Sequence, residues 1–103
     1  MAQFDVYPHP VEEWRDLSPY VVDIQSDLVR GVRNRLTIPL THLWVESPTE
    51  RLAPVVQVEG KALFLDTLDV VAFSSADLRG PLGNLRSDAP RIWSALDYAL
   101  HGY

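Results

Sequence analysis

The sequence predicts a mainly β protein, a small antiparallel barrel or strongly bent sheet on which one C-terminal α-helix docks. Three observations support this fold class. Several short β-rich segments alternate in hydropathy before residue 75, a glycine-containing turn joins two of them, and helical periodicity begins only after residue 83. A chain of 103 residues is expected to form one domain, here residues 1–103.

The first half of the chain supplies the first strands, and these are expected at residues 3–7, 20–25 and 35–40, with 42–46 as a further strand or an extension. In the first strand Phe4 and Val6 share one face, and Tyr7 lies on the other. Pro8 is expected to end that strand. A loop with at most one helical turn fills residues 11–19, and Pro39 indicates an edge strand or a bulge in the third strand.

The second half supplies a hairpin, a last strand and the helix. Residues 55–58 and 61–65 flank Glu59-Gly60, a pair typical of a tight hairpin turn, and residues 70–73 form another strand. Ser87 is expected to cap the helix, with Asp88 in its first turn. The apolar stripe and the helix end are predicted from Ile92, Leu96, Ala99, Leu100 and Gly102, with Trp93 beside the stripe or at a subunit interface.

Composition excludes several classes of protein. The chain has no cysteine, which removes disulfide scaffolds, thiolate metal sites and cysteine nucleophiles and fits a reducing cytoplasm. No apolar run reaches the roughly 18 residues of a membrane span, and the N-terminus lacks the pattern of an export signal. We therefore expect a soluble cytoplasmic protein that has no membrane association.

Charge is distributed unevenly along the chain. The net charge is −5, and residues 1–27 hold six acids and one base, whereas residues 28–36 hold three arginines and no acid. Direct DNA binding draws on many basic contacts, and this chain offers only the cluster Arg30, Arg33 and Arg35. A protein partner is the better hypothesis, and the plain interpretation of the cluster is a solvated loop.

Catalytic and cofactor motifs are absent from the sequence. His9, His42 and His101 fall in three different predicted elements without metal-ligand spacing, so we expect no metal or other cofactor. His9, between two prolines, is interpreted as an exposed loop residue. No nucleophile elbow surrounds any serine, and no catalytic residue is assigned. Trp14, Trp44 and Trp93 are most simply core residues.

Several segments, taken in order, resemble the CcdB family of bacterial toxin–antitoxin toxins. Residues 3–7 are similar to that family's first strand, and residues 22–28 (VDIQSDL) are the most specific match, a strand that runs into a Gln-Ser-Asp-aliphatic turn. Residues 38–40 (IPL) and 54–56 (PVV) follow at family-like spacing, and a helix ends within three residues of the C-terminus. The resemblance spans essentially the whole chain.

The resemblance implies an SH3-like barrel that acts as a homodimer. It implies binding to the A subunit of DNA gyrase, trapping of gyrase on cleaved DNA, and neutralisation by a CcdA-like antitoxin, which supplies most of the DNA contact in autoregulation. The resemblance thus implies that the toxin contacts DNA only indirectly, through the antitoxin or gyrase. Mapped onto matching positions, the gyrase contact comprises His101, Gly102, Tyr103, Leu100, Asp97, Ser26, Leu28 and Val29. The antitoxin is expected at the acidic loop, at His9, Trp14 and Arg15.

The C-terminus departs from the family pattern. The family's pattern ends Trp-Gly-Ile, whereas this chain ends with His101, Gly102 and Tyr103. An imidazole offers a smaller stacking face than an indole, and it is ionisable. Two alternatives to gyrase poisoning stay open: an endoribonuclease toxin of the same barrel superfamily, which would use the Arg30/Arg33/Arg35 loop, and a non-toxic homologue that retains antitoxin binding.

Overall fold

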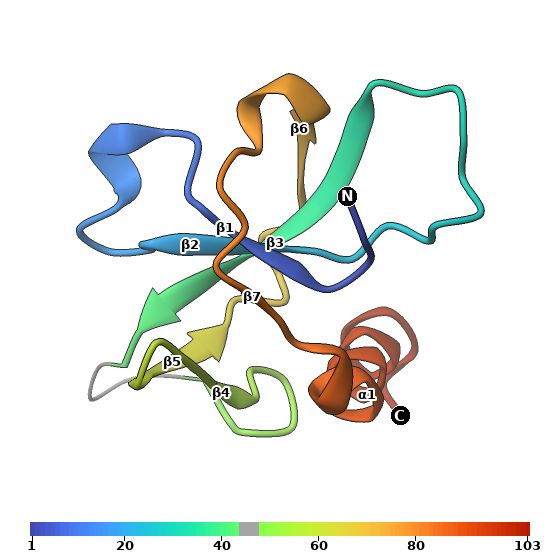
Figure 1. Ribbon diagram of the computed structural model, residues 1–103. Coiled ribbons are helices and arrows are strands. Elements are labelled where there is room, and N and C mark those ends of the chain that lie inside the picture. The colour runs from blue at the N-terminus through green and yellow to red at the C-terminus, as the bar shows by residue number, and fades with distance from the viewer. Residues whose placement is uncertain (44–47) are drawn as a thin grey trace.

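The computed structural model describes residues 1–43 and 48–103, and these form a nearly closed antiparallel barrel with one helix packed against it (Figure 1). The strands are β1 (Asp5–Pro8), β2 (Tyr20–Asp23), β3 (Asn34–His42), β4 (Val55–Val58), β5 (Lys61–Leu65), β6 (Val71–Ser74) and β7 (Gly83–Asn84). The helix α1 spans Ala89–His101, and short 3-10 turns are η1 (Glu12–Trp14), η2 (Ser75–Asp77) and η3 (Arg86–Asp88). The predicted fold class is confirmed. The strand expected at 42–46 falls largely outside the described residues.

Strand β3 is the centre of the sheet. It pairs with β2 along one edge, and along its other edge it pairs first with β6 and then with β5. Pro39 lies in the middle of β3, opposite Val21, so the expected edge strand or bulge is wrong. The Pro39 carbonyl accepts a hydrogen bond from the Asp66 amide at 2.9 Å. Proline has no backbone N–H. At Pro39 this causes no loss of pairing, because the position lies between the segments of β3 that pair with β6 and with β5.

The hairpin of β4 and β5 forms as predicted. Glu59 and Gly60 both have positive φ angles, 50° and 78°, and Val58 lies opposite Lys61. Two consecutive positive φ angles define a type I′ turn, whose twist matches that of the flanking strands. This local geometry brings the hydrophobic residues of β5 to the interior beside β3.

The main core lies between the barrel and α1. Ile92 and Ala95 are the fully buried residues of the helix, and Leu96 packs beside them. The predicted stripe is therefore shifted, because Leu100 is 74% exposed. Trp93 is 39% exposed and its ring lies 5.3 Å from that of Phe4, so it widens the packed face rather than standing free.

A second, smaller cluster fills the opposite side of the β1–β2 pair. Tyr7, Val21 and Leu78 are buried there, with Phe73 packed against them. Both faces of β1 are thus covered, although the sequence predicted one solvated face. Burial, together with the nearby carboxylates, raises the pKa of Tyr7 to about 12. β1 also runs one residue further than expected, because Pro8 still lies opposite Tyr20.

The two ends of α1 differ in how they are closed. Ser87 lies in the preceding η3 turn, so the predicted serine cap is wrong, and Asp88 occupies the cap position without a side-chain hydrogen bond to the backbone. Its carboxylate instead accepts a hydrogen bond from Arg91 at 2.9 Å. Gly102 ends the helix as predicted, with a φ of 79° and its N–H bonded to the Tyr98 carbonyl. The short β7, which pairs with β1, was not predicted.

Candidate protein-binding surfaces

The N-terminal loop (residues 9–19) is held by hydrogen bonds within itself and to strand β3. The His9 amide donates to the Pro19 carbonyl at 2.9 Å, which closes the base of the loop. The Arg15 guanidinium donates to the His9 carbonyl at 2.7 Å. The Ser18 and Thr41 hydroxyls, both buried, are 2.9 Å apart and hydrogen bonded. The loop is therefore a shaped surface rather than a loose connection.

His9 is the internal support of this loop, and the expectation of an exposed histidine is wrong. The side chain is 1% exposed, and its Nδ1 accepts a hydrogen bond from the Val11 amide at 3.0 Å. Its ring lies 5.6 Å from that of Trp14 and 5.7 Å from that of Phe73. Burial, followed by the positive charge of Arg15, lowers the pKa of His9. The neutral imidazole with its proton on Nε2 is the form that fits this packing.

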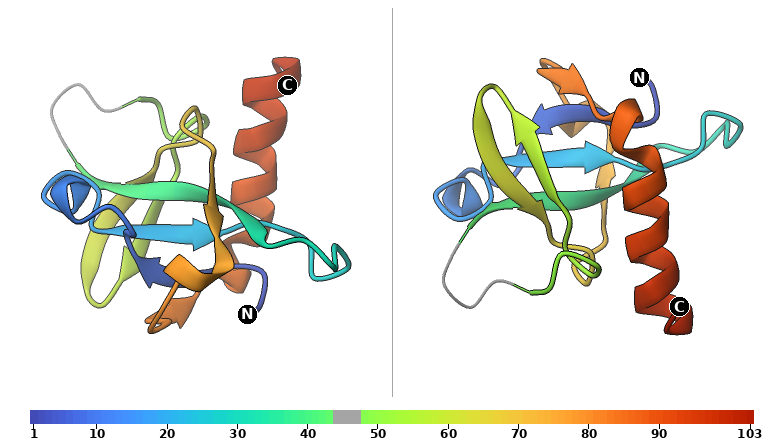
Figure 2. Two further views of the ribbon diagram at one scale, coloured as in Figure 1. Left: turned by 90° about the horizontal axis from the view of Figure 1, so that it is seen from above. Right: turned by 90° about the horizontal axis from the view of Figure 1, so that it is seen from below.

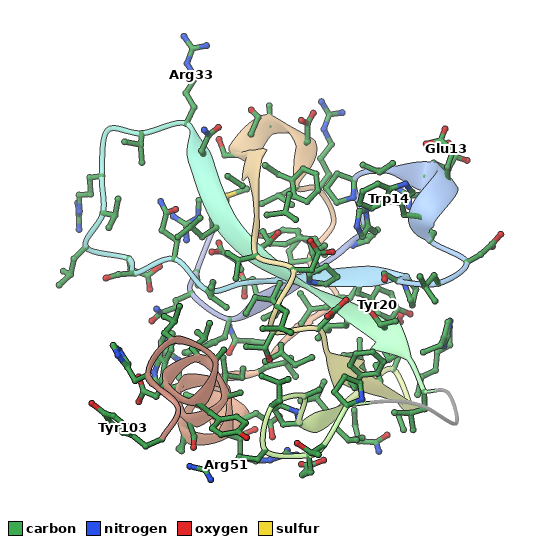
Figure 3. All side chains as sticks on the ribbon, turned by 180° about the vertical axis from the view of Figure 1, so that it is seen from behind. Glu13, Trp14, Tyr20, Arg33, Arg51 and Tyr103 are labelled. Carbon is green, nitrogen blue, oxygen red and sulfur yellow. The ribbon has the colours of Figure 1, made fainter. Side chains whose placement is uncertain are left out.

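Trp14 stands on the outside of this support. It is 53% exposed, so it is not a core residue, and Figure 3 shows its ring on the η1 turn beside Glu13. The ring forms one wall of a cavity of about 370 Å³ lined by Glu13, Trp14, Leu17, Ser18, Asp66 and Asp69. The sequence pointed only to the residues of the loop. Asp66 and Asp69 are distant in sequence, and the barrel fold brings them to the cavity.

The turn after β2 is anchored by a buried ion pair. The Asp23 carboxylate has no exposed surface, and its Oδ2 lies 2.7 Å from the Arg35 guanidinium. The other carboxylate oxygen accepts a hydrogen bond from the Gln25 amide at 2.9 Å. Burial raises the pKa of Asp23 in spite of these hydrogen bonds. Arg35 therefore belongs to the structure of the turn and not to a free basic cluster.

Beyond that anchor, residues 26–33 form a projecting loop. The Ser26 hydroxyl accepts a hydrogen bond from the Leu28 amide at 3.1 Å, which makes a tight turn. Leu28 is 86% exposed and Val29 is exposed beside it. Arg33 points away from the body of the molecule (Figure 3). This loop presents apolar and basic side chains together.

The C-terminal tail (residues 101–103) continues from the exposed end of α1. The rings of His101 and Tyr103 are stacked on each other, with centroids 5.8 Å apart and planes inclined by 28°. Tyr103 is 77% exposed, and Asp97 and Leu100 on the last turns of the helix are also exposed. The tail therefore offers two aromatic rings and an aliphatic side chain to solvent.

The residues expected to contact gyrase do not form one patch within a single chain. Figure 2 shows the projecting loop near the start of α1 and the C-terminus at the helix's other end. An apolar groove of about 480 Å³ lies between these regions. It is lined by Ile24, Leu36, Thr67, Leu68, Val70, Leu96, Ala99 and Leu100. The groove contains no charged side chain, and Leu100 joins it to the tail.

Other kinds of site find little support in the described part of the chain. Within residues 1–43 and 48–103, no three histidine, aspartate or glutamate side chains gather as metal ligands do. No helix there combines the length and the apolar character needed to cross a membrane. The candidate ribonuclease loop loses one of its three arginines, because Arg35 is held by Asp23.

Fold and surfaces together define a small barrel protein whose candidate binding surfaces are a structured loop, a projecting loop and an exposed helix end. Comparison with protein families gives this class a name. The family profile described as CcdB protein matches residues 3–102, and the chain belongs to the CcdB family, the toxins of toxin–antitoxin modules. None of the curated proteins matches the sequence.

Proposed function

We propose that this chain is a toxin that binds the A subunit of DNA gyrase in the cytoplasm and traps gyrase on cleaved DNA. The proposal rests on the family match across residues 3–102, joined to an exposed C-terminus at the position of the family's gyrase contact. The toxin acts by binding and carries out no catalysis of its own. Inhibition follows because the bound toxin stabilises the cleaved state of its target.

The C-terminal tail is the proposed centre of the gyrase contact. His101 and Tyr103 supply stacked, exposed rings, and such amphipathic rings contribute large contact areas at low conformational cost. Leu100, Gly102 and Asp97 surround them at the helix end. Ser26, Leu28 and Val29 supply a second contact on the projecting loop.

A homodimer formed through the apolar groove is the second part of the proposal. A second copy presents the same uncharged face, so a two-fold interface would bury apolar surface against apolar surface there. Such a dimer would cover Leu68 and Val70 and would place two sets of tails and loops on one assembly. We expect sedimentation at micromolar concentration to give a dimer, and Leu68→Lys to give a monomer. Leu82→Lys, which changes an exposed leucine outside the groove, is the matched control. A wild-type monomer would contradict this part.

The antitoxin is proposed to bind the N-terminal loop through His9, Trp14 and Arg15. Antitoxin arms of this kind fold on binding and wrap a broad surface, and Trp14 is the exposed aromatic anchor available here. Trp14→Ala should weaken antitoxin binding, whereas Tyr103→Ala, which removes an exposed aromatic from the tail, should not. Unchanged affinity in a folded Trp14→Ala protein would move the site elsewhere.

The gyrase proposal is tested by supercoiling and cleavage assays with purified gyrase. Accumulation of cleaved, gyrase-bound DNA is the expected result. RNA cleavage without this accumulation would identify the ribonuclease alternative. Antitoxin binding with neither activity would identify a homologue that is no longer toxic.

A further inference from the structure

The cavity beside Trp14 carries negative charge that its own surroundings leave unpaired. Glu13, Asp66 and Asp69 contribute three carboxylates to its lining of six residues. The ion pairs found within residues 1–43 and 48–103 use Arg35 and Arg91, and neither pairs with any of these carboxylates. The cavity is therefore an acidic site without a cation.

Burial makes that unpaired charge costly. Asp66 is half buried, and burial followed by the charge of Asp69 raises the pKa of Asp66. A higher pKa means that the ionised carboxylate is destabilised at this position. A cation placed between Asp66 and Asp69 would offset both the desolvation of the Asp66 carboxylate and its repulsion by Asp69. The local electrostatics thus favour a positively charged ligand.

The rest of the cavity lining is an indole, an aliphatic side chain and the Ser18 hydroxyl, which is bonded to Thr41. The Trp14 ring packs at a tilt against the ring of the buried His9, with centroids 5.6 Å apart, and Leu17 adds an aliphatic side chain to the cavity. The buried His9 keeps an Nε2 without a hydrogen-bond partner in the part of the chain described. The region therefore holds an unsatisfied N–H donor, which only a hydrogen-bond acceptor can satisfy, beside carboxylates with which a cation can pair.

A guanidinium group fits these features better than an ammonium group. Guanidinium is planar, stacks on aromatic faces and forms paired hydrogen bonds with carboxylates. A cation over a tryptophan face gains further electrostatic attraction from the ring. A lysine ammonium would gain the charge interaction but not the stacking or the paired geometry. The site chemistry distinguishes the two.

We propose that the Trp14 cavity binds an arginine side chain of a polypeptide, stacked on the indole and paired with Asp66 and Asp69. The identity of that polypeptide as the antitoxin rests on the function proposed above. The arginine would be the specific anchor that sets the register of the antitoxin segment on the loop.

The test uses a small probe whose chemistry is known. N-acetyl-arginine N-methylamide is added to the full-length protein, and the indole N–H resonances of Trp14 and Trp93 are followed by NMR. We expect saturable shifts at Trp14 but not at Trp93. The citrulline analogue, which has the shape without the charge, should cause no shift, and the lysine analogue should bind more weakly. Equal binding of lysine, or no shift with arginine, would overturn the proposal.

A pair of variants with equal charge change localises the effect. Asp66→Asn with Asp69→Asn should weaken binding of the arginine probe about tenfold. Glu12→Gln with Asp16→Asn alters two exposed acids of the same loop outside the cavity and should leave it unchanged. Equal weakening by both pairs would show only a general charge effect and would refute the site.

The outcome is separable from that of the antitoxin proposal. If Trp14→Ala weakens the antitoxin while the arginine probe causes no shift, the loop binds antitoxin without an arginine anchor and this inference is wrong. If the probe binds and Trp14→Ala leaves antitoxin affinity unchanged, the arginine site is supported and its assigned partner is wrong.

Discussion

The N-terminal loop and the C-terminal tail are both candidate binding surfaces, yet the protein holds them in opposite ways. The loop is built around a buried histidine, is closed by the His9–Pro19 hydrogen bond and is bonded to the barrel through Thr41. The tail contains the helix cap, Gly102, and its two rings stack on each other. Substitutions in the loop should therefore alter stability together with recognition, whereas substitutions in the tail should alter recognition alone.

The largest effect is expected at the anchor of the projecting loop, which extends the comparison to a third surface. Arg35→Ala leaves the Asp23 carboxylate buried without its partner. Breaking a buried ion pair from one side costs about 3 kcal/mol or more of unfolding free energy. Denaturant unfolding measures this loss, and Arg33→Ala, which removes an exposed arginine of the same loop, is the control. Similar stability of the two variants would show that this surface is as independent of the core as the tail.

Deletion of residues 101–103 tests the independence of the tail. The deletion removes side chains beyond the last buried residues of α1, so the melting temperature, dimerisation and antitoxin binding should change little. Loss of an aromatic anchor costs about 2 kcal/mol or more in binding, so gyrase affinity should fall at least thirtyfold. Calorimetry measures the melting temperature, and titration with gyrase measures the affinity. His101→Trp should strengthen gyrase binding, because indole offers a larger face. Equal gyrase affinity before and after deletion would refute the assignment.

Removing the same side chain, histidine, from the loop and from the tail compares the two surfaces directly. His9→Ala removes a buried ring and leaves the Val11 amide without its acceptor, so it should cost about 2 kcal/mol of stability. His101→Ala removes an exposed ring and should change stability by no more than about 0.5 kcal/mol. Urea unfolding of the two proteins measures the difference. A comparable cost at both positions would mean that the tail packs more tightly than its exposure indicates.

The smallest expected effect is the pH dependence of the loop. The pKa of His9 is lowered in the folded protein, so the folded state binds fewer protons than the unfolded state once the pH falls below about 6.5. Its contribution to stability is complete above that pH and is lost progressively as the pH falls toward the folded pKa. Melting temperatures between about pH 5 and 8 should drop less in His9→Gln than in the wild type. An equal drop in the two proteins would show that His9 is not the source of the pH dependence.

The sequence predicted what depends on local chemistry. The tight hairpin turn followed from Gly60, and the helix end followed from Gly102, because both positions have positive φ angles that few residues other than glycine adopt. Periodicity also located most strands within one or two residues. The predicted site residues on the tail are all exposed, but their role is still a prediction.

What the sequence did not predict depends on contacts made across the barrel. His9 looked exposed because its neighbours are prolines, but Phe73, far along the chain, buries it. Arg35 looked like one of three free bases until β3 placed it against Asp23. The acidic cavity was hidden for the same reason, because Asp66 meets Trp14 only after β3 and β5 have paired. Each of these contacts depends on how the strands pair, which the composition of a single segment does not determine.

Pro39 and the strand around it have a consequence for the order of folding. β3 pairs with three strands that arise before and after it in the chain, and the change of partner falls at the proline. The β4–β5 hairpin can form early, because its strands are neighbours in sequence. The barrel closes only when β3 has paired with β2, β5 and β6. Hydrogen exchange should therefore be slowest at the amides of β3 on either side of Pro39. Pro39 itself has no backbone N–H to exchange, and it lies where β3 changes its partner from β6 to β5.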